Sequence, residues 1–167
     1  MSPRAAWRLE DLGFLDVARY SGGLADWRAS GLPIEGSAAS DLDVAEVARD
    51  DVPTCDPREE IGAVRERMDA AGWDTCVVVN ERRIVLGRLF AEDLAGVDPR
   101  ASAEEAMRSG PATYRPDFQG HHLLDLMEER DLETSLVTTS DGVLIGAVRR
   151  ADLADAVVRR HAAHAKR

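Results

Sequence analysis

The strongest constraint on the fold of this chain is a short pattern that occurs twice, in residues 87–94 and in residues 146–153. Each copy reads as the end of a strand that turns into a helix, with a glycine six places before an aspartate. The copies lie 59 positions apart, and the same offset aligns other residues without a gap: Thr54 with Thr113, Pro57 with Pro116, Met68 with Met127 and Val78 with Val137. An internal duplication is the simplest explanation of this spacing.

Both copies predict the same order of elements, which is helix, strand, helix, strand, strand, helix. A capping box opens the first helix of each copy, at residues 43–46 and 102–105. Pro57 suits the first position of the helix that follows. Two paired strands are predicted in each copy: 75–79 with 84–86, and 135–138 with 143–145. The expected fold class is α/β (α+β), built from two β-α-β-β-α repeats.

The chain divides into five predicted segments: an appendage at 1–36, a linker at 37–42, repeats at 43–101 and 102–158, and a polar C-terminal tail at 159–167. Within the appendage, Trp7, Tyr20 and Trp27 are the expected apolar anchors. The histidine pairs His121–His122 and His161–His164 have no second ligand pair in view, so no metal site is predicted.

The appendage resembles the end of a rhodanese domain. Residues 20–33 carry Gly22-Gly23 before a helix with Trp27, and they end in a Gly-x-Pro exit. That resemblance implies an alternative function, a residual sulfurtransferase, but the catalytic cysteine of a rhodanese lies upstream of this segment. Cys55 follows the segment in a strand-like run without a Gly-rich or arginine-bearing anion cradle, so it is a poor nucleophile. We therefore interpret residues 1–36 as a remnant retained for packing or dimerisation.

Composition limits the classes of partner. The chain has 167 residues, of which 44% are apolar, and this is enough for one globular core. A net charge of −10 argues against general binding to nucleic acid or to anionic membranes. No run approaches the ~20 apolar residues of a membrane span, no signal peptide is evident, and the two cysteines read as buried thiols, so a cytoplasmic location is expected.

Residues 43–158 resemble a pair of CBS domains, often called a Bateman module. The resemblance rests on the duplicated β-α-β-β-α units, on Thr54 and Thr113 in the first strands, and on the repeated glycine-to-aspartate motif. It implies two repeats packed through their sheets about a pseudo-twofold axis, with two clefts between them. In this family the clefts commonly hold AMP, ADP, ATP, NADH or S-adenosylmethionine, and the resemblance also implies a homodimer.

The chemistry of the motif fits such a ligand. A glycine at the end of a strand lets the backbone approach a flat base, and an aspartate at the next helix start can accept two ribose hydroxyl groups. Asp93 and Asp152 are the candidates. The alternative is that each aspartate merely caps its own helix.

The two clefts are predicted to be unequal. The family usually has Ser or Thr three places before the aspartate, where this chain has Phe90 in one copy and Arg149 in the other. Phe90 cannot donate to a phosphate, so the first cleft is expected to be weak, closed or selective for an uncharged ligand end. The second cleft, with Gly146, Arg149 and Arg150, is expected to hold an anion. The alternative is that both arginines only neutralise nearby acids.

Three functions follow from these patterns. The favoured one is a regulatory module that senses an adenosine-containing nucleotide and acts through dimerisation or on an unknown protein partner. The second is a CBS pair without a ligand that serves as an interaction scaffold. The third, the residual sulfurtransferase, lacks a nucleophile in a suitable place, so the chain is not expected to be an enzyme or to require a cofactor.

Overall fold

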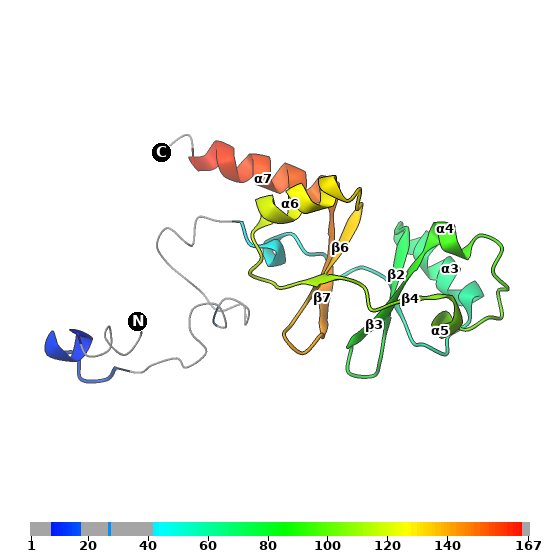
Figure 1. Cartoon of the computed structure of the whole chain (residues 1–167), viewed down its shortest axis with the longest axis horizontal. Coiled ribbons are helices and arrows are strands. Elements are labelled where there is room, and N and C mark those ends of the chain that lie inside the picture. The colour runs from blue at the N-terminus through cyan, green and yellow to red at the C-terminus, as the bar shows by residue number, and fades with distance from the viewer. Residues whose placement is uncertain (1–7, 18–26, 28–41, 165–167) are drawn as a thin grey trace.

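The computed structural model describes residues 8–17, 27 and 42–164 (Figure 1). The predictions made for Trp7, Tyr20, the double glycine and most of the linker fall outside these residues. In the described part of the appendage, residues 8–11 are helical, and Gly13 just beyond them has a positive φ of 92°, which is typical of a helix C-terminus.

The first repeat contains a small sheet covered by helices. Its elements are β1 (Thr54–Cys55), α3 (Ile61–Ala71), β2 (Thr75–Val79), β3 (Val85–Phe90) and α4 (Ala91–Leu94). Gly72 ends α3 in the left-handed conformation, with φ 65°. Every residue of β2 is buried, and the strand pairs in parallel with β1 and antiparallel with β3. The predicted strands and helices of this repeat are all present, but α3 begins at Ile61 and not at Pro57 as predicted.

The second repeat has the same order of elements at the predicted offset: β5 (Thr113–Tyr114), α6 (Gly120–Glu129), β6 (Thr134–Thr138), β7 (Leu144–Arg149) and α7 (Arg150–His164). The last helix, α7, extends into the predicted polar C-terminal tail and continues to His164. An ion pair between Arg160 and Glu46 holds this extended end of α7 against the opening segment of the first repeat.

The opening segment of each repeat packs against the other repeat. The 3-10 helix η2 (Val44–Glu46) belongs to the first repeat by sequence, yet the amide of Val44 donates to Phe118 O at 3.0 Å. Symmetrically, α5 (Ala103–Ala106) opens the second repeat, and the amide of Ala103 donates to Glu59 O at 2.9 Å. Both predicted capping boxes are present at these helix starts.

We call these opening segments the exchanged segments, because each packs against the repeat to which it does not belong by sequence. The exchanged segment of the second repeat also contains a short strand that the sequence pattern did not predict. β4 (Arg108–Ser109) follows α5 and pairs antiparallel with β3 of the first repeat, so the first sheet has four strands in the order β1-β2-β3-β4. At the equivalent place in the other repeat, Arg49 forms an isolated antiparallel bridge with Ala147 of β7. The second sheet has three strands, in the order β5-β6-β7.

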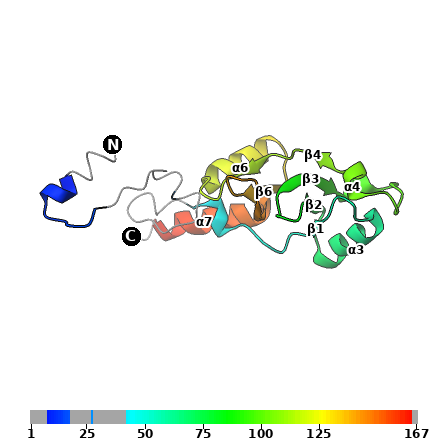
Figure 2. The same cartoon turned by 90° about the horizontal axis from the view of Figure 1, so that it is seen from below.

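The two sheets face each other, and their helices lie on the outer sides (Figures 1 and 2). One hydrophobic cluster joins the sheets and includes Val77 of β2, Leu136 of β6, Ala147 of β7 and Trp73. The hairpin turns of the repeats also meet, through an antiparallel bridge between Ile84 and Val143. These two residues occupy equivalent positions in the repeats, so the bridge marks the pseudo-twofold axis. The mixed α/β class predicted from sequence is confirmed.

Candidate ligand-binding clefts

The first cleft lies where β3 ends and α4 begins. Phe90 is the N-cap residue of α4 and Asp93 lies in its first turn, so Asp93 does not cap the helix. The carboxylate of Asp93 instead accepts a hydrogen bond from Nη2 of Arg108 at 2.6 Å. This bond raises the pKa of the Arg108 guanidinium. The motif aspartate of the first copy therefore holds the short strand β4 of the exchanged segment.

Phe90 is flanked by two arginines. The guanidinium carbon of Arg88 lies 4.5 Å from the centroid of the Phe90 ring, and that of Arg108 lies 4.6 Å from it. Both distances are within the range of cation–π interactions. Phe90 itself donates nothing to a ligand, but it positions two side chains that can.

Arg88 is buried, with 8% of its surface exposed. Its Nε donates to Oγ1 of Thr75 at 2.7 Å, and its Nη1 donates to the carbonyl oxygen of Thr134 at 2.9 Å. The second bond crosses from β3 of the first repeat to β6 of the second. Burial lowers the pKa of Arg88 to about 10, so the guanidinium is still charged at neutral pH.

A pocket of about 580 Å³ lies beside Phe90, between the repeats. Its lining comes from both sheets and from the loops next to them: Asp74, Arg88, Phe90, Ala91, Glu92, Arg108, Asp131, Leu132, Glu133 and Thr134. The volume is within the usual range for small-molecule sites. The cleft that carries Phe90 is thus hollow in this structure.

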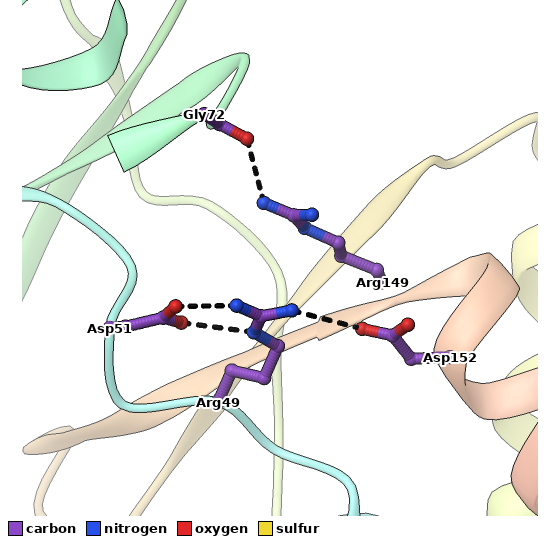
Figure 3. A network of polar contacts seen from close by, with 5 residues as sticks. All are labelled: Arg49, Asp51, Gly72, Arg149 and Asp152. Atoms are coloured by element: carbon purple, nitrogen blue, oxygen red, sulfur yellow. Dashed lines mark hydrogen bonds and ion pairs between the residues drawn. The ribbon is translucent and has the colours of Figure 1, made fainter. Parts of the chain in front are cut away.

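In the second cleft, the motif arginine Arg149 contacts the facing repeat (Figure 3). Arg149 is the last residue of β7, and its guanidinium carbon lies 3.9 Å from the centroid of the Trp73 ring in the first repeat. Nη2 of Arg149 also donates to the carbonyl oxygen of Gly72 at 2.8 Å. The residue predicted to hold an anion thus contacts an aromatic ring and a carbonyl oxygen of the facing repeat.

Arg49 links two carboxylates in the same cleft (Figure 3). Its Nε and Nη2 donate to the two carboxylate oxygens of Asp51, at 3.0 and 2.5 Å, and its Nη1 lies 3.7 Å from the carboxylate of Asp152. The hydrogen bonds from Arg49 lower the pKa of Asp51, and the same bonds raise the pKa of Arg49. Asp152 is the predicted ribose acceptor of this cleft, and here it faces an arginine of the exchanged segment.

The comparisons with known proteins agree with this architecture. Residues 102–159 match the family model of the CBS domain. The structure superposes on the CBS domains of a transcriptional regulator from Streptococcus pneumoniae with a TM-score of 0.65 and 17% sequence identity, over 68% of this chain and 98% of that chain. This chain has the fold of a CBS domain pair.

Two further structures with the CBS-pair fold contain nucleotides. CBSX2 in complex with AMP superposes with a TM-score of 0.65 at 17% identity, over 71% of this chain and 97% of that chain. The cytosolic domain of the Mg²⁺ channel MgtE in complex with ATP superposes with a TM-score of 0.63 at 21% identity, over 92% of this chain and 59% of that chain.

A curated relative is an uncharacterized protein from Methanopyrus kandleri, which is 28% identical over 119 residues. The match covers 67% of this chain, and this chain spans about three fifths of that relative, 61% of its length. These comparisons give the rhodanese resemblance no support. Cys55, the candidate nucleophile of that alternative, is buried at 4% exposure on the helix side of the first sheet.

The remaining predicted site residues, Thr54, Thr113 and Arg150, do not themselves line the pocket beside Phe90. Thr54 begins β1 and Thr113 begins β5, where its hydroxyl group accepts a hydrogen bond from Thr138 at 3.1 Å. Arg150 pairs with Asp131 at 3.2 Å and with Glu133. Arg150 therefore has the alternative role considered in the sequence analysis, in which it neutralises nearby acids.

The two motif glycines allow close packing of the exchanged segments in the CBS pair. A side chain at Gly146 would collide with the backbone carbonyl of Arg49, and one at Gly87 would collide with the side chain of Met107. The space next to each glycine is thus taken by the chain itself. Sequence reasoning placed a ligand base there.

Sequence reasoning missed Arg88, Arg108, Arg49 and Trp73. A signal for two of them exists, because Arg49 and Arg108 are separated by the repeat offset of 59 and therefore occupy equivalent positions. Trp73 has no aromatic counterpart in the second repeat, where Leu132 stands.

No group of three His, Cys, Asp or Glu side chains within residues 8–17, 27 and 42–164 could hold a metal ion. None of the helices in that part of the chain is both long and apolar enough to cross a bilayer.

Proposed function

We propose that this chain is a regulatory module that binds an adenosine-containing nucleotide between its two CBS repeats. The observation that most supports the proposal is the pocket of about 580 Å³ at the end of β3, which both repeats line. The nucleotide complexes of CBSX2 with AMP and of MgtE with ATP have the same fold and lend it further support. AMP, ADP, ATP, NADH and S-adenosylmethionine are the ligands to test.

The geometry favours the first cleft as the tighter site. The pocket beside Phe90 is already open, and a purine ring can stack on the aromatic side chain that lines it. Asp93 would accept the ribose hydroxyl groups, which requires it to exchange its bond with Arg108 for bonds to the ligand. Each such bond to a carboxylate contributes about 1.5–3 kcal/mol, and two ribose hydroxyl groups offer two bonds in place of the one that is lost.

The second cleft is proposed as a weaker site for the same class of ligand. A nucleotide there would use Arg149 and Asp152, because the backbone of Arg49 occupies the space beside Gly146. It must first displace Arg149 from Trp73 and Arg49 from Asp152. Both displacements oppose binding. We therefore keep the prediction that the two clefts differ, but we propose that the first cleft binds more tightly than the second.

The regulatory output is proposed to be a change in self-association or in the binding of a separate protein. Ligand that bridges the two repeats alters how tightly they pack, and a partner surface that spans both repeats would respond to that change. We propose a cytoplasmic homodimer as the acting form, and no catalytic step.

Thermal unfolding with the five ligands tests this function. A ligand at 100 times its dissociation constant stabilises the folded state by about 2.7 kcal/mol, which raises Tm by about 5–10 °C for a chain of this size. We expect Asp93→Ala to remove the shift and Asp152→Ala to leave most of it. Asp125→Ala, an exposed aspartate on α6, is the charge-matched control. Equal loss in the Asp93 and Asp152 variants would contradict the unequal clefts.

A ligand-free scaffold is the second candidate, and one observation favours it. Both motif aspartates and Arg149 already have partners inside the protein: Asp93 has Arg108, Asp152 has Arg49, and Arg149 has Trp73. A scaffold of this kind would show no Tm shift with any of the five ligands, yet would form a stable dimer in light scattering. A nucleotide-dependent shift excludes it.

A further inference from the structure

Two arginines stand directly opposite each other across the strands β3 and β4. Arg88 and Arg108 are register partners in this antiparallel pair, so their side chains share one face of the sheet. Phe90 lies two residues beyond Arg88 and therefore shares that face as well, which is the face turned to the second repeat. Like charges directly opposite on neighbouring strands destabilise a sheet. The arrangement needs compensation by negative charge.

Only one of the two arginines forms an ion pair within the described residues, whereas Arg88 is attracted by the charge of Asp74 without a direct contact. Arg108 pairs with Asp93 at 2.6 Å and with Glu92 at 3.7 Å. Arg88 forms no ion pair with any carboxylate of the described residues, and its two hydrogen bonds go to neutral oxygens of Thr75 and Thr134. Its third donor nitrogen, Nη2, has no hydrogen-bond partner among those residues. This nitrogen is not among the enclosed side-chain atoms that lack a partner, and Arg88 lines the pocket, so an anion in the pocket can reach it.

The fold itself does not require an arginine at this position. The equivalent residue of the second repeat is Ala147, which is buried in the cluster that joins the two sheets. An apolar residue is thus sufficient for packing, and the charge of Arg88 calls for a different explanation.

We propose that the pocket beside Phe90 holds a single phosphate group, or a similar oxyanion, between Nη2 of Arg88 and the guanidinium of Arg108. This inference rests on the proposed function and names the group of the nucleotide that the first cleft recognises. Planar guanidinium groups offer paired donors that match phosphate oxygens. The lowered but still basic pKa of Arg88 keeps its charge at neutral pH.

The acidic rim of the pocket limits the ligand to a short anion. Asp131 and Glu133 are neutralised by Arg150, whereas Asp74 has no ion-pair partner among the described residues and Glu92 has only a distant one in Arg108. A polyphosphate that extends past Arg88 would approach these carboxylates and be repelled by them. A monophosphate is therefore preferred over a triphosphate.

The test compares adenosine, AMP, ATP and inorganic phosphate on the full chain by calorimetry and thermal unfolding. We expect AMP to bind roughly 10- to 100-fold more tightly than adenosine, as one or more charge-assisted hydrogen bonds require. ATP should bind more weakly than AMP, and inorganic phosphate alone should raise Tm and compete with AMP.

Three variants locate the effect. Arg88→Met should abolish the difference between AMP and adenosine, and Arg108→Met should reduce it, while Arg115→Met, at an exposed arginine outside the pocket, should leave it unchanged. Arg88→Lys keeps the charge without the fork and should retain only part of the preference. If Arg88→Met fails to fold, Arg108→Met and Arg88→Lys decide the result.

The outcomes separate this inference from the proposed function. Equal affinities for adenosine and AMP would overturn the phosphate site and leave nucleotide binding intact. Binding of phosphate without binding of any adenosine compound would support the site and overturn the nucleotide function. If Arg115→Met lowered the preference for AMP over adenosine as much as Arg88→Met does, the preference would come from general surface charge and not from this site. If none of the probes bound, both the phosphate site and the nucleotide function would be refuted.

Discussion

Arg149 of the second repeat stacks on Trp73 of the first, with its guanidinium carbon 3.9 Å from the centroid of the ring. The same guanidinium donates to the carbonyl oxygen of Gly72 at 2.8 Å. The position that usually carries a hydroxyl side chain in the CBS motif thus forms a contact between the repeats. A ligand of the second cleft must compete with this contact, and its strength can be measured directly.

Arg149→Ala should destabilise the folded chain by about 1–2 kcal/mol, because it removes a cation–π contact and a hydrogen bond between the repeats. Urea unfolding gives the free-energy difference. The fluorescence of Trp73 should change at the same time, since the stacked cation leaves its ring. Arg159→Ala is the matched control, an exposed arginine on α7. Equal stability of the two variants would show that the stack contributes nothing.

The two motif glycines offer a paired test of the exchanged segments. Gly146→Ala should destabilise by about 1–3 kcal/mol, because the added methyl group meets the rigid backbone of Arg49. Gly87→Ala should cost less, because the side chain of Met107 can rotate away. Thermal or urea unfolding of both variants measures the difference. A larger cost at Gly87 would mean that the close approach at Arg49 relaxes easily.

Arg49 gives the chain a predictable response to acid. Its hydrogen bonds hold the pKa of Asp51 below the ordinary value in the folded state. The stabilisation is therefore complete above the unfolded pKa of about 3.9, and it is lost as the pH falls through the lower folded pKa. Unfolding free energies of the native chain and of Asp51→Asn should differ at neutral pH and converge below about pH 4. A difference that stays constant down to pH 2 would contradict this linkage.

The thiol of Cys76 should be unreactive in the folded protein. A hydrogen bond with Cys55 and burial both raise its pKa, so the nucleophilic thiolate is scarce. Labelling with iodoacetamide at pH 8 should require unfolding in urea. Ser140→Cys places a thiol in an exposed turn and supplies the reference rate. Native labelling of Cys76 at a comparable rate would show that the first sheet opens readily.

The elements of the fold were predictable because their determinants are local. The capping boxes at Asp43 and Ser102, the glycine that ends α3 and the buried runs of β2 and β6 all act within a few residues. The duplication then set the order of the elements twice. These features are sufficient to identify the class of fold from sequence.

The contents of the clefts were not predictable, because they depend on contacts between distant segments. Arg149 and Gly72 are 77 positions apart, and Arg88 and Thr134 are 46 apart. The strand that brings Arg108 opposite Arg88 has only two residues, which is too short to leave a periodic pattern. A motif could therefore locate the corner of each cleft but could not reveal which side chains fill it.

The mutual exchange of opening segments bears on how such a chain could arise. A single repeat on its own would lack the neighbouring segment that covers its glycine-bearing strand, but two identical copies could supply that segment to each other as a symmetric dimer. Joining the copies in one polypeptide preserves the same contacts and ends the requirement that both sites carry the same residues. Phe90 and Arg149 could then diverge at equivalent positions, a freedom that a dimer of identical subunits does not have.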